Sequence, residues 1–183
     1  MLKWLGADMT YWFVIDVESI GLHGQHYAVG WVVLDAQNGE EKESGYFACP
    51  PQHAFGSEKD REWVRKNAPE LPVTHRSPWE ITSEFCNLWN RLKKQYEGVA
   101  MAADCCYPVE TNFLNNCAPY GLEGPYPLFE ISSILFADGK DPVGTYHRLS
   151  NELPRHHPLH DARQSGRLLI ESTTSRHRQN DQR

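Results

Sequence analysis

The sequence lacks the cysteine patterns of a disulfide framework or a cysteine zinc site. Its five cysteines are an odd number, two of them are the neighbours Cys105 and Cys106, and none form a C-x-x-C pair. Reduced thiols packed as small hydrophobic side chains are therefore expected.

Long apolar segments are also lacking. The apolar runs are too short to span a bilayer, so no membrane role is expected. The first eight residues contain one lysine, an early aspartate and no long apolar core, which does not match a secretory signal, and we expect a cytoplasmic protein. With 183 residues, of which 40% are hydrophobic, the chain has enough material for one globular domain with a substantial core.

Positive charge is in the minority, since 18 lysines and arginines face 24 aspartates and glutamates and the formal net charge is −6. Domains that hold nucleic acid by bulk electrostatic attraction usually carry a clustered basic surface. This argument against a nucleic-acid partner weakens if some of the acids bind divalent cations, because the ions would cancel their charge and attract phosphate.

The first half of the chain has the pattern of three strands joined by turns. Runs rich in β-formers occupy residues 11–17 and 27–34, and a third strand is expected near 43–47. Asn38-Gly39, between the second and third runs, is a strong hairpin signal. We therefore predict an antiparallel meander.

The second half alternates helices with short strands. Ser57 and Ser77 are suitable N-caps, and large apolar residues recur at three- and four-residue steps after Ser77. The apolar run 98–104 is typical of a buried parallel strand that delivers Asp104 at its carboxyl end. The other predicted elements are helices at 57–66, 78–96, 109–117 and 132–136, a strand at 126–131, and a last helix from Pro154 or Pro158 to Glu171.

The domain is expected to cover residues 1–171. Residues 172–183 contain no large hydrophobic side chain, and we predict a flexible C-terminal tail there.

Two acids stand inside the first apolar run. Asp16 and Glu18 are two positions apart, so on a strand both side chains point to the same face. Ionised carboxylates on a buried strand have a large desolvation cost, which a raised pKa, a cationic side chain or a divalent metal would offset. Pairing with a lysine or arginine is the purely structural alternative.

Three segments, taken in order, carry a resemblance to a known family. They are F-V-I-D-V-E-S-I-G-L at 13–22, A-A-D at 102–104 and H-H-P-L-H-D-A at 156–162. Together they resemble the three exonuclease motifs of the DEDDh family, which includes ribonuclease T, oligoribonuclease and proofreading exonucleases. The third motif of this family is a histidine, four residues and an aspartate, and His156 rather than His157 has that spacing to Asp161.

The resemblance implies a fold and a reaction. The fold would be the α/β ribonuclease H-like fold, with a mixed five-stranded sheet, its second strand antiparallel, flanked by helices. The reaction would be metal-dependent 3′-to-5′ hydrolysis of single-stranded nucleic acid, RNA rather than DNA, which releases nucleoside 5′-monophosphates. A homodimer is also expected from the resemblance.

Site roles carry over motif by motif. The resemblance implies that Asp16, Glu18 and Asp161 bind one ion, that Asp16 bridges to a second ion, that Asp104 holds the second ion mainly through water, and that His156 is the general base. Two Mg²⁺ or Mn²⁺ ions are expected, since an all-oxygen ligand set suits hard cations. A histidine near neutral pH can accept the proton of an attacking water.

The spacing from His156 to Asp161 also predicts local structure. Five residues of a regular helix rotate the chain by about 500°, which is one turn plus about 140°. The two side chains would not share a helix face, so we expect His156 in the loop or first turn, with Pro158 near the start of the helix.

Some of these site residues have alternative interpretations. Asp104 could cap the helical stretch that follows it. His156, His157 and His160 could instead form a zinc site with Asp161, although the sequence offers no adequate partner set elsewhere. His157 and His160 are more simply explained as solvated or close to substrate.

Substrate contacts are expected just after the first motif, from Ser19, Ile20, Gly21 and Leu22. Tyr107 and Glu110, which follow the second motif, are further candidates. Glu110 could also approach the metals or fix nearby backbone, whereas a solvated glutamate in a first helical turn is the favoured alternative.

Other aromatic and basic residues are weaker candidates. Bases stack on aromatic faces, so Tyr107, Trp79 and Phe113 are possible platforms, but core packing is the better prediction for Phe113. Arg61, Arg65, Lys66, Lys93 and Lys94 could form a weak phosphate rail, and solvated helix faces explain them better.

Three other functions remain open at this stage. One is a 3′-to-5′ exodeoxyribonuclease, a second is a nucleic-acid-binding module of the same fold without catalysis, and a third is a phosphohydrolase that acts on free nucleotides.

Overall fold

The computed structural model describes residues 3–4, 7–142 and 156–180, and its central feature is a five-stranded sheet. The strand order is β5-β4-β3-β6-β7. Strand β4 is antiparallel to both of its neighbours, whereas β3, β6 and β7 run parallel, so the predicted mixed sheet with an antiparallel second strand is confirmed. The strands are β3 (Tyr11–Ser19), β4 (His26–Asp35), β5 (Glu41–Ala48), β6 (Val99–Ala103) and β7 (Phe129–Glu130). A separate two-stranded pair, β1 (Lys3–Trp4) with β2 (Ala7–Asp8), precedes the sheet and was not predicted.

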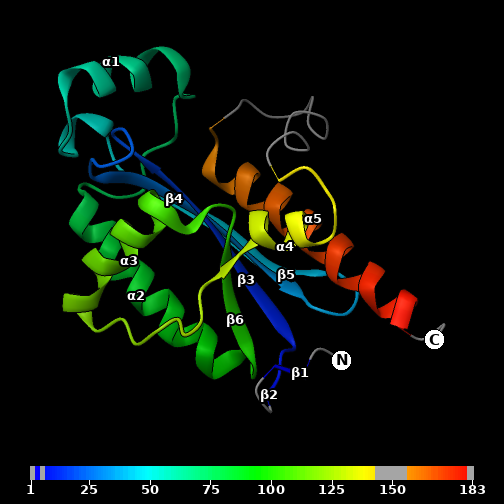
Figure 1. Ribbon diagram of the computed structural model, residues 1–183. Coiled ribbons are helices and arrows are strands. Elements are labelled where there is room, and N and C mark those ends of the chain that lie inside the picture. The colour runs from blue at the N-terminus through cyan, green and yellow to red at the C-terminus, as the bar shows by residue number, and fades with distance from the viewer. Residues whose placement is uncertain (1–2, 5–6, 143–155, 181–183) are drawn as a thin grey trace.

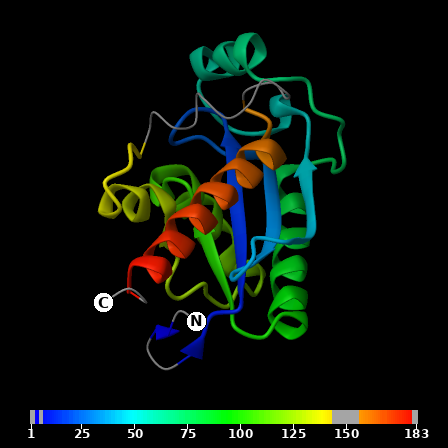
Figure 2. The ribbon, with the colours of Figure 1, turned by 90° about the vertical axis from the view of Figure 1, so that its right-hand side faces the viewer.

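Helices cover both faces of the sheet. Figure 1 shows α2 and α3 on one side and α4 and α5 on the other, and Figure 2 shows α5 crossing the sheet obliquely with α1 above it. The helices are α1 (Glu58–Asn67), α2 (Pro78–Gln95), α3 (Thr111–Cys117), α4 (Ile131–Ala137) and α5 (Pro158–Asn180), with short helical segments η1 (Pro51–His53), η2 (Cys106–Glu110) and η3 (Ala118–Tyr120). Among the described helices, none is both long and apolar enough to cross a membrane.

The alternation of β3 divides its side chains between two cores. Phe13, Ile15 and Val17 pack with α1, α2 and α3, while Trp12 and Val14 pack with α4 and α5. All five are buried, which explains why this strand is apolar along most of its length. Asp16 and Glu18 continue the face of Trp12 and Val14, so they lie on the side of α5, at the carboxyl end of the strand.

Glycine allows α5 to approach the sheet closely. A Cβ atom added to Gly30 of β4 would lie 2.0 Å from the carbonyl carbon of Pro158, in the first turn of α5. Further along α5, a Cβ on Gly166 would meet the Cδ1 atom of Leu34 at 2.6 Å. Because Gly30 pairs with Asp16 across β3 and β4, the start of α5 lies directly beside Asp16.

The last helix is longer than the sequence predicted. The predicted end at Glu171 is wrong, since α5 continues to Asn180. Ser172 and Thr173 are buried, and the Thr173 hydroxyl donates to the carbonyl of Leu169 at 3.0 Å. Lys140 donates to the Ser172 hydroxyl at 2.9 Å. Small polar residues therefore line the packed face of this part of α5. The sequence did not reveal this face, because it contains no large hydrophobic residue. The alternative start at Pro154 lies outside the described residues.

The predicted strand 126–131 is mostly wrong. Only Phe129 and Glu130 pair with β6, and α4 begins at the next residue. Pro125 and Pro127 have no N–H to donate to a strand ladder, which accounts for the short β7. The five cysteines are all free. Cys49, Cys86 and Cys117 are buried, as expected of thiols that pack as small hydrophobic side chains, whereas Cys105 is exposed.

The contact between Gly30 and α5 gives a stability prediction. Gly30→Ala should lower the free energy of unfolding by about 1–3 kcal/mol, because the backbone of Pro158 and Leu159 would have to move. Gly166→Ala is the matched control from the same interface. Its added methyl group meets only the end of a leucine side chain, and alanine favours a helix interior over glycine by about 1 kcal/mol. Urea unfolding of both variants measures the difference, and equal effects would contradict a special role for Gly30.

Candidate active site

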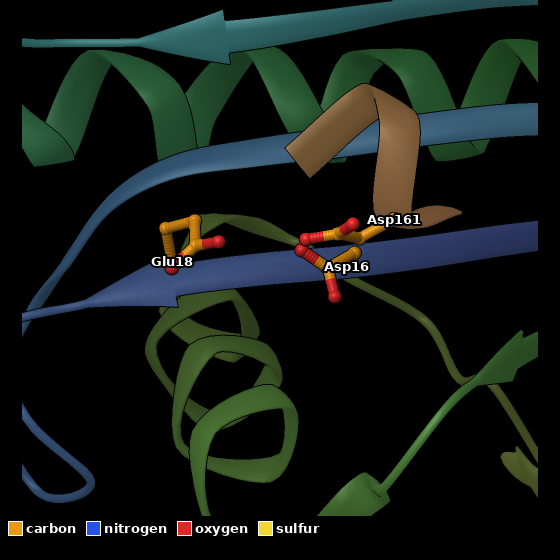
Figure 3. Close-up of side chains that lie close together, drawn as sticks. All are labelled: Asp16, Glu18 and Asp161. Atoms are coloured by element: carbon orange, nitrogen blue, oxygen red, sulfur yellow. The ribbon is translucent and has the colours of Figure 1, made fainter. Parts of the chain in front are cut away.

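Three carboxylates converge at the carboxyl end of β3. Asp16 and Glu18 come from the strand and Asp161 comes from the first turn of α5, and Figure 3 shows Asp161 directed toward the strand acids. One carboxylate oxygen from each of the three residues lies within 4.8 Å of the others. The sequence placed these acids in separate motifs, and the fold brings them together.

Burial and mutual repulsion disfavour the charged forms of these acids. Burial is the largest cause of a pKa of Asp16 well above its usual range, and the charges of Glu18, Asp161, Glu110 and Asp104 add to it. Burial, with the charges of Asp161 and Glu110, raises the pKa of Glu18 to about 8. Burial also raises the pKa of Asp161 to about 6, although the nearby His156 opposes this shift.

The cluster is a group of oxygens that could hold a cation, and the described part of the chain supplies no basic side chain to it. One oxygen of Asp16 is buried and has no hydrogen-bond partner among the described residues. Within the part of the chain that the structure describes, no lysine or arginine contributes to the pKa shifts of Asp16 or Glu18, so the alternative of strand acids paired with a basic side chain is not supported. An all-oxygen set of partly buried carboxylates fits a hard divalent ion.

Asp104 lies at the edge of this cluster. It directly follows β6, as predicted, and its charge raises the pKa values of both Asp16 and Asp161. The segment that follows begins at Cys106 with Cys105 in the N-cap position, so Asp104 does not cap it. The structure therefore places Asp104 close to the three converging acids.

His156 lies beside Asp161, just before α5. It is a turn residue with a φ of 63°, and α5 begins two residues later at Pro158, which confirms the predicted position of both residues. The backbone N–H of His156 donates to the carboxylate of Asp161. The histidine ring meets the ring of Trp63 edge to face, with 5.2 Å between centroids.

Trp63 is a neighbour of the site that the sequence argument missed. It lies on α1, and half of its side chain is exposed. A single tryptophan among the charged residues of this short helix was the available signal. Asp60, on the same helix, closely approaches Gly21 of the loop after β3, so α1 contacts both the first and the third motif segments.

The zinc alternative is not supported by the geometry. In residues 9–142 and 156–174, whose side chains are described, the one group of potential ligands that converges consists of the three acids, without a histidine. His157 instead packs edge to face on Tyr46, with 5.5 Å between ring centroids.

The residues after the first motif divide into buried and exposed members. The Ile20 side chain is 1% exposed and belongs to the core, so it cannot offer an apolar contact to a ligand. Ser19 donates to the carbonyl of Gly21 at 2.7 Å, which shapes the loop. Leu22 and Tyr107 are 65% and 71% exposed and remain candidates for substrate contact.

The weaker candidates have mostly structural roles. Phe113 is buried in the core, as the sequence favoured, and Trp79 stacks on Tyr120 with 6.5 Å between centroids. Arg65 pairs with Glu58 at 2.5 Å and Lys66 pairs with Glu62 at 2.7 Å, so part of the suggested phosphate rail is already matched with acids.

Glu110 is the main correction among the site residues. The favoured alternative was a solvated glutamate, yet Glu110 is only 7% exposed. Burial raises the pKa of Glu110 to about 7, although hydrogen bonds from its own backbone N–H and that of Val17 oppose this shift. Its charge in turn raises the pKa values of Asp16 and Glu18, which makes it a fifth acid of this region.

The raised pKa of Glu18 gives a pH prediction for the protein without metal. The folded state holds the Glu18 proton up to about pH 8, whereas the unfolded chain releases it near the ordinary value of 4.5. The free energy of unfolding should therefore fall as pH rises through this window. Glu18→Gln should remove the part of this loss of stability that Glu18 causes. The variant should therefore have a higher Tm than the wild type at pH 8 in chelator.

Glu43→Gln is the control with the opposite sign. Hydrogen bonds from Arg91 hold the pKa of Glu43 below its usual value, so its charged form stabilises the fold at neutral pH and the glutamine variant should have a lower Tm. Thermal unfolding followed by circular dichroism measures both variants. A lower Tm for Glu18→Gln at pH 8 would contradict the electrostatic cost assigned to the cluster.

Comparison with known proteins gives similarity in structure but not in sequence. No protein-family model and no curated protein sequence matches the chain. A full-length 3′-exonuclease has a TM-score of 0.66 at 12% identity, over 91% of this chain and 83% of that one. Pop2p of S. pombe, in a form with Mg²⁺ and Mn²⁺ bound, has a TM-score of 0.61 at 13% identity, over 87% of this chain and 81% of that one.

A third solved structure comes from the family that the sequence motifs resemble. The nuclease domain of 3′hExo, a DEDDh family member bound to rAMP, has a TM-score of 0.56 at 14% identity, over 91% of this chain and 93% of that one. At 12–14% identity these solved structures establish the fold alone. The chain therefore has the ribonuclease H-like fold of the DEDDh exonucleases, with its acid cluster at the carboxyl end of the first long strand.

Proposed function

We propose that the protein is a metal-dependent 3′-to-5′ exoribonuclease that releases nucleoside 5′-monophosphates from single-stranded RNA or 3′ overhangs. The observation that carries the proposal is the convergence of Asp16, Glu18 and Asp161 within 4.8 Å, with His156 beside Asp161. The similarity to a DEDDh nuclease domain bound to rAMP, and to Pop2p in a form with Mg²⁺ and Mn²⁺ bound, supports it.

The acids would hold two Mg²⁺ or Mn²⁺ ions. Asp16, Glu18 and Asp161 would bind one ion, with Asp16 shared by a second that Asp104 helps to hold. When bound, such ions supply a nucleophilic water at neutral pH and neutralise charge at the phosphate that is cleaved. Binding would also relieve the repulsion that now raises the pKa values of the cluster.

His156 would act as the general base. An imidazole nitrogen of His156 accepts the proton of the attacking water, and proximity to Asp161 stabilises the imidazolium that results. The ring contact with Trp63 and the backbone bond to Asp161 hold the residue in place before α5. The exposed apolar surfaces of Leu22 and Tyr107 would contact the terminal nucleotide.

A nuclease assay tests the proposal directly. The wild type, incubated with 5′-labelled single-stranded RNA and Mn²⁺, should shorten the RNA stepwise from its 3′ end, and chelator should stop the reaction. Asp16→Asn should abolish the reaction, because under the proposal this carboxylate would help to hold both ions. Glu62→Gln, an exposed acid on α1, is the control and should keep wild-type activity.

The same assay separates the competing functions. Faster degradation of single-stranded DNA than of RNA would make the protein an exodeoxyribonuclease. Hydrolysis of free nucleotides alone would indicate a phosphohydrolase. Binding of RNA without metal-dependent turnover would overturn the proposed enzyme and indicate a binding module.

His156→Ala separates the base from the metal site. The variant should bind Mn²⁺ with wild-type affinity, because the carboxylates are intact, while the rate falls by about 10²- to 10⁴-fold. Calorimetric Mn²⁺ titration and single-turnover RNA cleavage measure the two quantities. His53→Ala, an exposed histidine on η1, should change neither. An unchanged cleavage rate in His156→Ala would remove this residue from the mechanism.

A further inference from the structure

The end of β3 extends beyond the strand beside it. Strand β6 pairs with β3 from Tyr11 to Ile15 and ends at Ala103, opposite Ile15, whereas β3 continues to Ser19. The two strand acids therefore lie in the part of β3 that β6 does not reach. Val17 stands between them and is 7% exposed, so its backbone N–H needs a partner other than water.

Glu110 provides that partner. After Asp104 the chain forms η2, in which Tyr107 has an extended conformation, and η2 packs on β3. This path returns Glu110 to the strand edge at the last residue of η2. There the Val17 N–H donates to the Glu110 carboxylate, and the buried Phe113 anchors the following helix α3 in the core.

We propose that Glu110 is a positioning residue of the active site. Its carboxylate takes the place of the missing β6 neighbour, holds the peptide group between Asp16 and Val17, and keeps Asp16 and Glu18 aimed at the same ions as Asp161. This inference rests on the proposed function for its catalytic consequence, but its structural claim concerns the backbone of β3 alone.

The geometry sets Glu110 apart from the three acids that converge. The described group of oxygens within 4.8 Å of one another comprises Asp16, Glu18 and Asp161 and does not include Glu110. A side chain that does not bind the metal, but holds the backbone beside a metal ligand, needs sufficient length and a hydrogen-bond acceptor. Its negative charge is not required, whereas a metal ligand depends on that charge.

Two variants separate the effect of side-chain length at position 110 from the effect of its negative charge. Glu110→Gln keeps the side-chain length and a carbonyl oxygen that can accept from Val17, but it has no charge. Glu110→Asp keeps the charge but is one methylene shorter, so it cannot span the same distance to the strand. Glu84→Gln, an exposed acid on α2, is the control.

The measurements are Mn²⁺ affinity by calorimetry, RNA cleavage rate, and hydrogen exchange at the Val17 amide. Glu110→Gln should keep the Val17 amide protected and bind Mn²⁺ nearly as the wild type does. Glu110→Asp should expose that amide to exchange and weaken Mn²⁺ binding by about 10- to 100-fold, as is usual when a supporting group of a metal ligand is lost. Cleavage rates should follow the same order.

The reverse order overturns the inference. If Glu110→Gln binds Mn²⁺ more weakly than Glu110→Asp, the charge matters and Glu110 is not a positioning residue. Wild-type affinity and Val17 protection in Glu110→Asp would also overturn it. Failure of the proposed function appears elsewhere, as a wild type without metal-dependent cleavage, and in that case Mn²⁺ affinity and amide exchange still decide the role of Glu110.

Discussion

Repulsion among partly buried carboxylates is the constraint on which the rest of the structure depends. Asp16, Glu18 and Asp161 share a space less than 5 Å across, and Asp104 and Glu110 add their charges from its edge. Such a cluster costs folding free energy unless protons or cations compensate for it. Two apolar cores, one on each face of the sheet, supply the stability that tolerates this cost. A site that destabilises the metal-free fold is expected where the same charges are needed for function.

The convergence depends on backbone approach as much as on the acids themselves. Asp161 reaches the strand acids only because α5 starts against Gly30, where any side chain would collide with Pro158. The helix is then tied to the far edge of the sheet, since Arg163 donates to both carboxylate oxygens of Glu41 on β5 at 2.6 and 3.0 Å. The first turn of α5 is therefore fixed on both sides of Asp161, which suits a carboxylate that must share an ion with residues of another element.

The sequence predicted most elements and the motif residues because both depend on local signals. The alternation in β3, the caps Ser57 and Ser77 and the spacing from His156 to Asp161 each correspond to the observed structure within a residue or two. The burial of Glu110, the contact of Trp63 with His156 and the need for Gly30 were not predicted. Each of these depends on how two distant segments approach each other, which no periodicity or cap records. The end of the last helix was predicted too early for a related reason. Ser172 and Thr173 are buried only because other elements cover them, and the sequence alone does not record this.

The acidic surface and the acid cluster also constrain how a polyanion could bind. The net charge is −6, and basic residues of α1 such as Arg65 and Lys66 are paired with neighbouring acids, so long-range attraction to a nucleic acid is weak or absent. Under the proposed function, ions held by the cluster would attract phosphate at the site itself, beside the exposed surfaces of Leu22, Trp63 and Tyr107. Attraction at the site suits an enzyme that holds the terminal nucleotide and releases the rest of the nucleic acid. Under the proposed function, short single-stranded ends would be favoured substrates, because attraction at the site acts on the terminal nucleotides.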